Sequence, residues 1–170
     1  MFIEAIIIGL LIGFIRGGRV LNIGIMDIRG WLLVVIAFVL QMIPIFFGFI
    51  SIISSIGHYI SFVAMLLMLV AVLINVEKKG FWIIALGAVM NLAAMGFNGL
   101  LMPVSLNGLA YIGFADIVEA VKLGDVVNYI SIENISHWSL YLGKIVTLPR
   151  LYPFAKVISF GDIFMSIGLF

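Results

Sequence analysis

Asp162 is the acidic residue that most invites a chemical role, because it opens an apolar segment that runs to residue 170. Ser159, Asp162 and Ser166 are spaced i, i+3 and i+7, so a helix would place the three side chains on one face. A carboxylate beside hydrocarbon is costly and usually has a partner or a function. Asp162 is therefore a candidate catalytic residue and Ser159 a candidate ligand contact. The alternative is a structural ion pair of Asp162 with Arg150 or Lys156, and Arg150 is itself a candidate ligand contact.

Three amides in the earlier apolar segments are further candidate ligand contacts. Asn91 and Asn98 share a stripe of small and polar residues at helical spacing, so Asn91 should face the interior of a bundle. Gln41 comes shortly before Pro44, which should kink a helix and free a carbonyl near Gln41. For Gln41, an interhelical hydrogen bond is the alternative to a ligand contact.

Acid–base chemistry in this chain would have to come from carboxylates. Two carboxylates that share one proton can activate water, as in aspartic peptidases. Asp162 would pair with Asp116, or else with Asp125 or Glu4. The sequence has no cysteine, only two histidines, no phosphate-binding glycine loop and no Gly-x-Ser-x-Gly motif. These patterns predict neither a metal nor a cofactor.

The composition indicates a membrane protein. Of the 170 residues, 65% are hydrophobic and 10% are charged, whereas soluble domains carry roughly 25% charged residues. A soluble domain of this size has too much surface to bury so many apolar side chains. The lipid bilayer is therefore the expected partner of the apolar faces. The net charge of +1 gives no indication of nucleic-acid binding.

The predicted fold class is all-α, a polytopic transmembrane helical bundle in a single domain over residues 1–170. The predicted spans cover about residues 1–15, 31–50, 58–75, 81–97 and 157–170, and residues 51–57 form a short connection. The segment 98–156 carries four of the eight acidic residues and should fold over the bundle as a partly helical cap. Within the cap, residues 109–121 and 137–146 are candidate short helices.

The basic residues predict the orientation. Two short connections hold Arg16, Arg19, Arg29, Lys78 and Lys79. Short loops rich in lysine and arginine stay in the cytoplasm. The N-terminus and the cap are then outside. No cleavage signature follows the first apolar segment, so we expect this segment to be retained.

The first span carries a stripe of small residues. Ala5, Gly9, Gly13 and Gly17 recur at every fourth position, as in close helix–helix contacts. This stripe packs within the chain or docks on a partner membrane protein.

Four separated motifs occur in a fixed order. They are Arg16-Gly17-Gly18-Arg19, Asn98-Gly99-x-x-Met102-Pro103-Val104-Ser105, Pro149-Arg150 and Ser159-Phe160-Gly161-Asp162. Together they resemble a family of small bacterial integral-membrane proteins with no assigned function. The resemblance implies a multi-pass protein of the bacterial cytoplasmic (inner) membrane and supplies no activity.

A second resemblance covers only residues 154–168. This segment is similar to the last motif of lipoprotein signal peptidases, which are membrane aspartyl peptidases whose second catalytic acid opens the last span. Asp162 matches that acid, but Ser159-Phe160-Gly161 departs from the motif. The family's first catalytic motif is absent, and its members have four spans.

Two functions are therefore expected as alternatives. The first is a non-enzymatic membrane protein that binds or conducts a small ligand, or assists a membrane complex, through an outer-face polar groove of Gln41, Asn91, Asn98 and Asp162. The second is a membrane aspartyl hydrolase that uses Asp162 and a second carboxylate of the cap.

Overall fold

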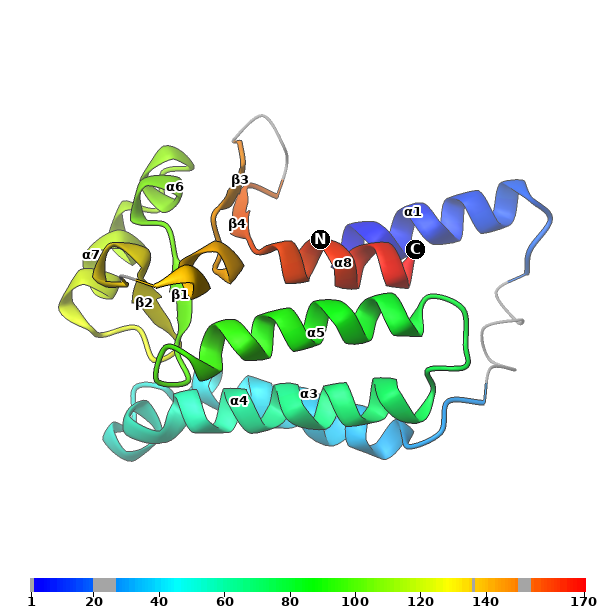
Figure 1. Cartoon of the computed structure of the whole chain (residues 1–170), viewed down its shortest axis with the longest axis horizontal. Helices are drawn as coiled ribbons and strands as arrows, with labels where there is room; N and C mark the ends of the chain where they lie inside the picture. Colours follow the sequence, from blue (N-terminus) through cyan, green and yellow to red (C-terminus); the bar gives the residue numbers. More distant parts are fainter. Residues whose placement is uncertain (1, 20–26, 136, 150–153) are drawn as a thin grey trace.

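The computed structural model describes residues 2–19, 27–135, 137–149 and 154–170, and the chain is mostly helical. A bundle of apolar helices is covered at one end by a cap of short helices and strands (Figure 1). The bundle helices are α1 (Phe2–Ile15), α3 (Trp31–Phe47), α4 (Ser51–Ile74), α5 (Phe81–Gly96) and α8 (Phe160–Leu169). Each of the five apolar segments expected from the sequence thus contains a helix, but the last helix begins at Phe160 and not at residue 157, because Lys156–Ile158 form a strand.

Short loops arrange the bundle helices as neighbours. Helix α3 packs on α4, α4 on α5, α5 on α8, and α1 on α8. Helices α3, α4 and α5 alternate in direction, and α8 runs antiparallel to α5 (Figure 1). The C-terminus of α5 and the N-terminus of α8 therefore meet at the cap.

Helix α4 begins at Ser51, so the expected connection at residues 51–57 is wrong. Gly57, the last residue of the expected connection, lies inside α4 and is buried. A Cβ atom at Gly57 would overlap the Val127 side chain and lie 3.2 Å from Pro44 Cβ. Gly57 is therefore a packing residue that admits the cap and α3, and a helical glycine with this role looks like a turn in a single sequence.

Helices α5 and α8 approach closely through glycines spaced by two helical turns. A Cβ at Gly161 would lie 2.6 Å from the Gly87 carbonyl oxygen, and a Cβ at Gly168 would lie 2.6 Å from the Gly80 carbonyl oxygen. Small residues at such positions let helix backbones come together. This contact fixes the position of α8 relative to Asn91 on α5.

The cap is built from short elements that pair over long sequence distances. Strand β1 (Met102–Val104) runs parallel to β2 (Tyr129–Ser131), and β3 (Val146–Leu148) runs antiparallel to β4 (Lys156–Ile158). The remaining cap elements are α6 (Leu106–Tyr111), α7 (Ala115–Leu123), η1 (Ile132–Asn134) and η2 (Trp138–Leu142). The expectation of an all-α fold is therefore confirmed only in its coarser form, a mostly helical chain.

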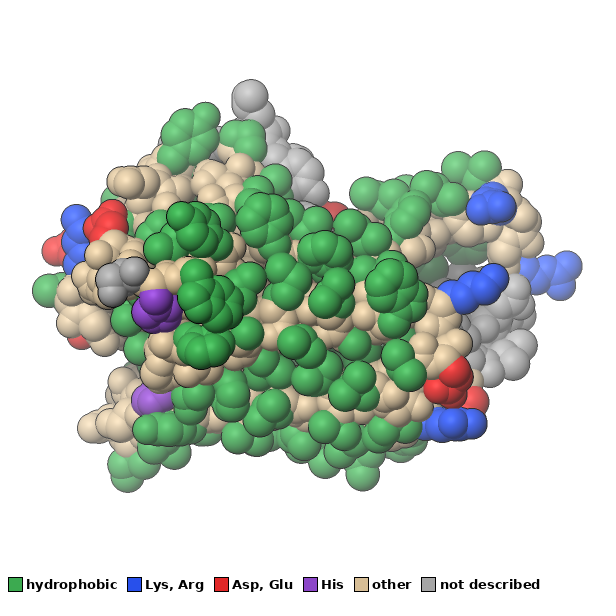
Figure 2. All heavy atoms as spheres, in the orientation of Figure 1, with side chains coloured by type: hydrophobic (Ala, Val, Ile, Leu, Met, Phe, Trp, Pro, Cys, Tyr) green, Lys and Arg blue, Asp and Glu red, His purple; other side chains and the backbone are tan. Residues whose placement is uncertain are grey.

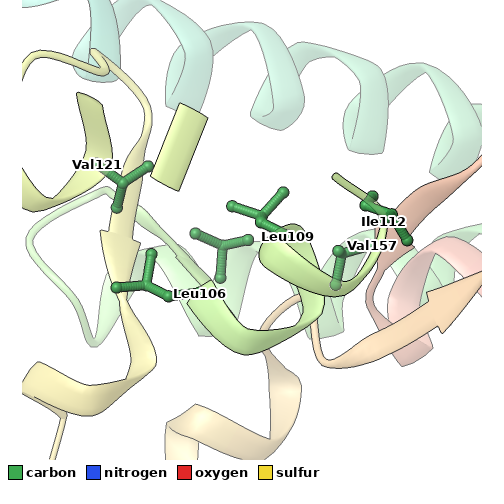
Figure 3. Close-up of a cluster of buried hydrophobic side chains, with 6 residues drawn as sticks. Leu106, Leu109, Ile112, Val121 and Val157 are labelled. Atoms are coloured by element: carbon green, nitrogen blue, oxygen red, sulfur yellow. The ribbon is translucent and has the colours of Figure 1, made fainter. Parts of the chain in front are cut away.

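The cap has its own apolar core, most of which Figure 3 labels. Its buried side chains are Val104, Leu106, Leu109, Ile112, Val121 and Val157.

The single helix expected over residues 109–121 is divided into α6 and α7, because Gly113 has a φ angle of +83°. A positive φ favours glycine and ends a helix.

One described helix, α4, is long and apolar enough to cross a membrane by length and composition. Residues 4–15 of α1 and helices α3, α5 and α8 form shorter apolar helices. The structure thus gives five apolar helices without establishing five spans.

The outer surface of the bundle is apolar. Helices α3, α4 and α5 contain no Asp, Glu, Lys or Arg. Large side chains on these helices are exposed, including Phe46, Ile52 and Trp82 at 65%, 71% and 59%. Figure 2 shows apolar side chains over the middle of this face and the charged side chains gathered at its two ends.

Candidate functional site

A polar network joins α5 to the start of α8. Asn91 Nδ2 donates to Asp162 Oδ1 at 3.0 Å, and Ser159 Oγ donates to Asn91 Oδ1 at 2.7 Å. Asn91 and Ser159 are buried, at 2% and 0% exposure. The burial of Asn91 agrees with the helical stripe seen in the sequence.

Ser159 and Asp162 also cap α8. Asp162 N donates to Ser159 Oγ at 2.9 Å, and Ser159 N donates to Asp162 Oδ2 at 3.1 Å. This reciprocal capping box satisfies two backbone N–H groups that a helix start leaves without intrahelical partners. Asp162 therefore has a structural role whether or not it contacts a ligand.

A second polar group, Lys144, lies on the cap side of the same region. Its Nζ donates to Tyr129 Oη at 3.2 Å and lies 5.1 Å from the centre of that ring. The backbone of Lys144 is fixed by the segment after α5: Lys144 N donates to Pro103 O at 2.7 Å, and Ser105 N donates to Lys144 O at 3.0 Å. The Met-Pro-Val-Ser segment thus positions a lysine that is distant in sequence.

Lys144 is a cation at neutral pH. Burial acts to lower the pKa of its amine, but interactions with Tyr129 and with Asp162 raise it, and the resulting pKa lies above the ordinary value. An ammonium has three N–H donors, and Tyr129 uses one of them. Lys144 can therefore donate to a further acceptor.

These groups face a cavity of about 330 Å³ between the cap and the bundle. Its polar lining comes from Tyr129, Lys144, Lys156 and Asp162. Its apolar lining comes from Val104, Leu109, Phe114, Ile117, Val157 and Ile158. The volume falls at the lower end of the range typical of small-molecule sites, roughly 300–1,000 Å³.

The second lysine of the cavity is paired. Lys156 forms an ion pair with Glu4 of α1. Arg150, the other basic residue considered as a partner of Asp162, lies outside the described residues. The described hydrogen bonds to the Asp162 carboxylate come instead from Asn91 and from the backbone of Ser159.

The structure does not bring Asp116 to Asp162. Asp116 is exposed in the first turn of α7 and is not among the residues that line the cavity. Over the described part of the chain, no second carboxylate forms a hydrogen bond with Asp162. A pair of carboxylates that shares a proton needs direct contact or one bridging water, so this arrangement gives the hydrolase hypothesis no support.

Asn98 belongs to a different network. Its Nδ2 donates to Ala94 O at 2.6 Å and to Ser139 Oγ at 2.8 Å, and Ser139 Oγ is 2.8 Å from His137 Nδ1. Asn98 follows Asn91 by seven residues, or about 10 Å of helix. It therefore ties η2 of the cap to the end of α5 and does not join the Asn91–Asp162 network.

Gln41 also lies apart from the cavity. It is half-buried on α3, which packs mainly on α4. The polar groove expected from Gln41, Asn91, Asn98 and Asp162 is thus divided, and Asn91, Ser159 and Asp162 are the residues that lie together.

The sequence reasoning missed Lys144 and Tyr129. The signal for Lys144 was its isolation, since it is the only described lysine or arginine between Leu123 and Pro149. A single lysine among Leu, Gly, Ile and Val has to find a partner when it is buried. Tyr129 carried no comparable signal, because its role follows from the pairing of β1 with β2.

Comparison with known families places this capped helical bundle in a defined class. The family of unknown function DUF5317 matches residues 25–170, and the chain belongs to it. The expected membership in an uncharacterised family is therefore confirmed, whereas the likeness to lipoprotein signal peptidases is not shown. The matched region includes α3 to α8 and all the residues that line the cavity, and it leaves out α1. No curated protein and no solved structure matches the chain.

Proposed function

We propose that the chain is a multi-pass membrane protein in which α1, α3, α4, α5 and α8 are the membrane segments. Helix α4 is about 36 Å long, and α5 is about 24 Å long, against a hydrocarbon core of roughly 30 Å. Helices α3, α4 and α5 contain no charged residue, and their exposed apolar side chains support this setting. Helix α8 covers about 15 Å, so it enters the bilayer from the cap side and lies against α5.

The charge distribution supports an orientation with the cap outside. The basic residues of the short connections lie at the end of the bundle opposite the cap (Figures 1 and 2). These are Arg16, Arg19, Arg29, Lys78 and Lys79. Under the positive-inside rule this end is cytoplasmic, and the N-terminus and the cap are outside, in the bacterial inner membrane.

Within that setting, the chain binds an amphiphile with an anionic head, such as a fatty acid or an alkyl phosphate, in the cavity between the cap and the bundle. The observation that carries this proposal is the charged Lys144 amine, which has donors to spare and faces a cavity with mostly apolar walls. The head would accept hydrogen bonds from Lys144, and the chain would lie against Leu109, Phe114 and Ile117. Asp162 holds α8 in place through its hydrogen bonds with Asn91 and Ser159.

The binding test uses a photoreactive dodecanoate on the purified protein in nanodiscs. The lysine is replaced in Lys144→Met, and Lys122→Met is the matched control because Lys122 is exposed on α7 away from the cavity. A hydrogen bond to a charged group contributes about 1.5–3 kcal/mol. Lys144→Met should therefore lower crosslinking to cavity peptides about tenfold or more, and Lys122→Met should leave it unchanged.

Competitors identify the chemistry of the ligand. Dodecanoate and dodecyl phosphate should both displace the probe, whereas dodecanol and inorganic phosphate should not. Because the pKa of Lys144 lies above the ordinary value for lysine, its amine stays charged between about pH 7 and 9. The affinity for dodecanoate should therefore not change over this range. Equal labelling of the wild type and Lys144→Met, or displacement by dodecanol, would overturn the proposal.

A further inference from the structure

A second hollow lies at the end of the molecule opposite the cap. It has a volume of about 490 Å³ and separates the second half of α1 from the ends of α5 and α8. Figure 2 shows it as a gap below α1, bordered by lysine and arginine side chains. Ile6, Leu10, Phe14, Ile84 and Leu169 form apolar walls, and Arg19 and Lys79 lie at its rim.

The glycines of α1 keep this groove open. A Cβ at Gly9 would meet Phe170 at 3.6 Å, in ordinary contact. A Cβ at Gly13, one turn further, would have no described heavy atom within 4 Å. The small-residue stripe thus touches α8 at one level and faces the groove at the next.

The rim of the groove is positively charged. Among the described residues, five basic and two acidic residues lie at this end, which gives a net charge of +3. One of the two acids, Glu77, is 3.2 Å from Arg29. Arg19 and Lys79 are both exposed and lie on the same groove from different segments.

We propose that the groove binds an anionic phospholipid. Its phosphate would contact Arg19 and Lys79, and one acyl chain would lie between α1 and the α5–α8 pair. An apolar helix of a partner protein would cover the apolar walls but leave the two cations at the rim without counter-charges. Charge complementarity therefore favours the lipid. The inference rests on the proposed membrane setting and is independent of ligand binding at Lys144.

The full chain is placed in nanodiscs of phosphatidylcholine, with or without phosphatidylglycerol, and is then released. Native mass spectrometry measures how much phosphatidylglycerol stays bound to it. The variant Arg19→Gln/Lys79→Gln removes the rim charges. Arg16→Gln/Lys78→Gln is the matched control, because it removes two charges from the same end that do not line the groove. The first variant should lower phosphatidylglycerol occupancy about tenfold, and the control should retain it.

A third variant, Gly13→Leu, fills the groove without touching the rim. It should displace the lipid and keep the fold, because the site beside Gly13 is open. Equal loss of lipid in both charge variants would indicate general surface attraction and overturn the proposal. A dimer that Gly13→Leu converts to a monomer would assign the groove to a second copy and overturn it as well. Dodecanoate crosslinking to the cavity peptides should be the same in all three variants, which separates this site from the cavity at Lys144.

Discussion

Helix α8 makes two contacts, one with α5 and one with α1, and both contain regularly spaced glycines. On the α5 side, Gly87 and Gly161 bring the backbones together, and the amide of Asn91 bonds to the start of α8. On the α1 side, Gly9 makes ordinary contact and Gly13 faces open space. Small residues therefore permit close helix packing without specifying it. The hydrogen bonds of Asn91 with Asp162 and Ser159 hold α8 against α5.

The largest expected effect comes from adding one methyl group to the closed contact. A Cβ at Gly161 would lie 2.6 Å from Asn91 Cγ and from the Gly87 carbonyl oxygen, and neither backbone can move freely. Overpacking of this kind costs about 1–3 kcal/mol. Gly161→Ala should lower the free energy of unfolding in detergent by about that amount. A value within about 0.5 kcal/mol of the wild type would show that the contact is looser than described.

The next effect separates the structural role of Asp162 from any role in binding. Asp162→Ala removes the acceptors for Asn91 Nδ2 and Ser159 N. Asp162 is only half-buried, so water can replace part of these bonds, and the total loss should be about 1–2 kcal/mol. Asp162→Asn keeps one acceptor oxygen and should lose about half as much. Folded yield and chemical unfolding measure both variants. Wild-type stability in both would refute the structural role and leave Asp162 to ligand binding.

The smallest effect is expected on the open side of α8. Gly13→Ala adds a methyl group where no described atom lies within 4 Å. Replacing glycine by alanine inside a helix usually stabilises by about 0.5–1 kcal/mol. The same unfolding assay should therefore show a small gain for Gly13→Ala beside the large loss for Gly161→Ala. A loss at Gly13 would mean that α1 packs more closely than the structure describes.

The sequence predicted the helices of the bundle well and the composition of the site less well. Apolar length and helical spacing are local signals, so they located the five helices and the burial of Asn91. The spacing of Ser159 and Asp162 likewise anticipated their shared position at the start of α8. The expected groove joined Asn91 to Asp162, and the hydrogen bond between them agrees with this. It also included Gln41 and Asn98, because helical spacing does not show which helices become neighbours.

The cap was harder to predict for the same physical reason. Strands of three residues are too short for a period of two to be visible. The position of Lys144 depends on a bridge to Val104, forty residues earlier. That pairing is non-local, so neither the cavity nor the separation of Asn98 from Asp162 could be read from the chain alone.

Both proposed binding sites depend on the membrane setting, and the natural absence of cysteine permits a direct test of it. Single cysteines would replace Lys122 in the cap, Lys78 at the basic end and the exposed Val89 in the middle of α5, and intact cells would be treated with a membrane-impermeant maleimide. We expect the cap position to be labelled in intact cells after outer-membrane permeabilisation. Position 78 should be labelled only after the inner membrane is opened, and position 89 only after denaturation. Labelling of positions 122 and 78 from the same side, or of position 89 in the folded protein, would contradict the membrane setting.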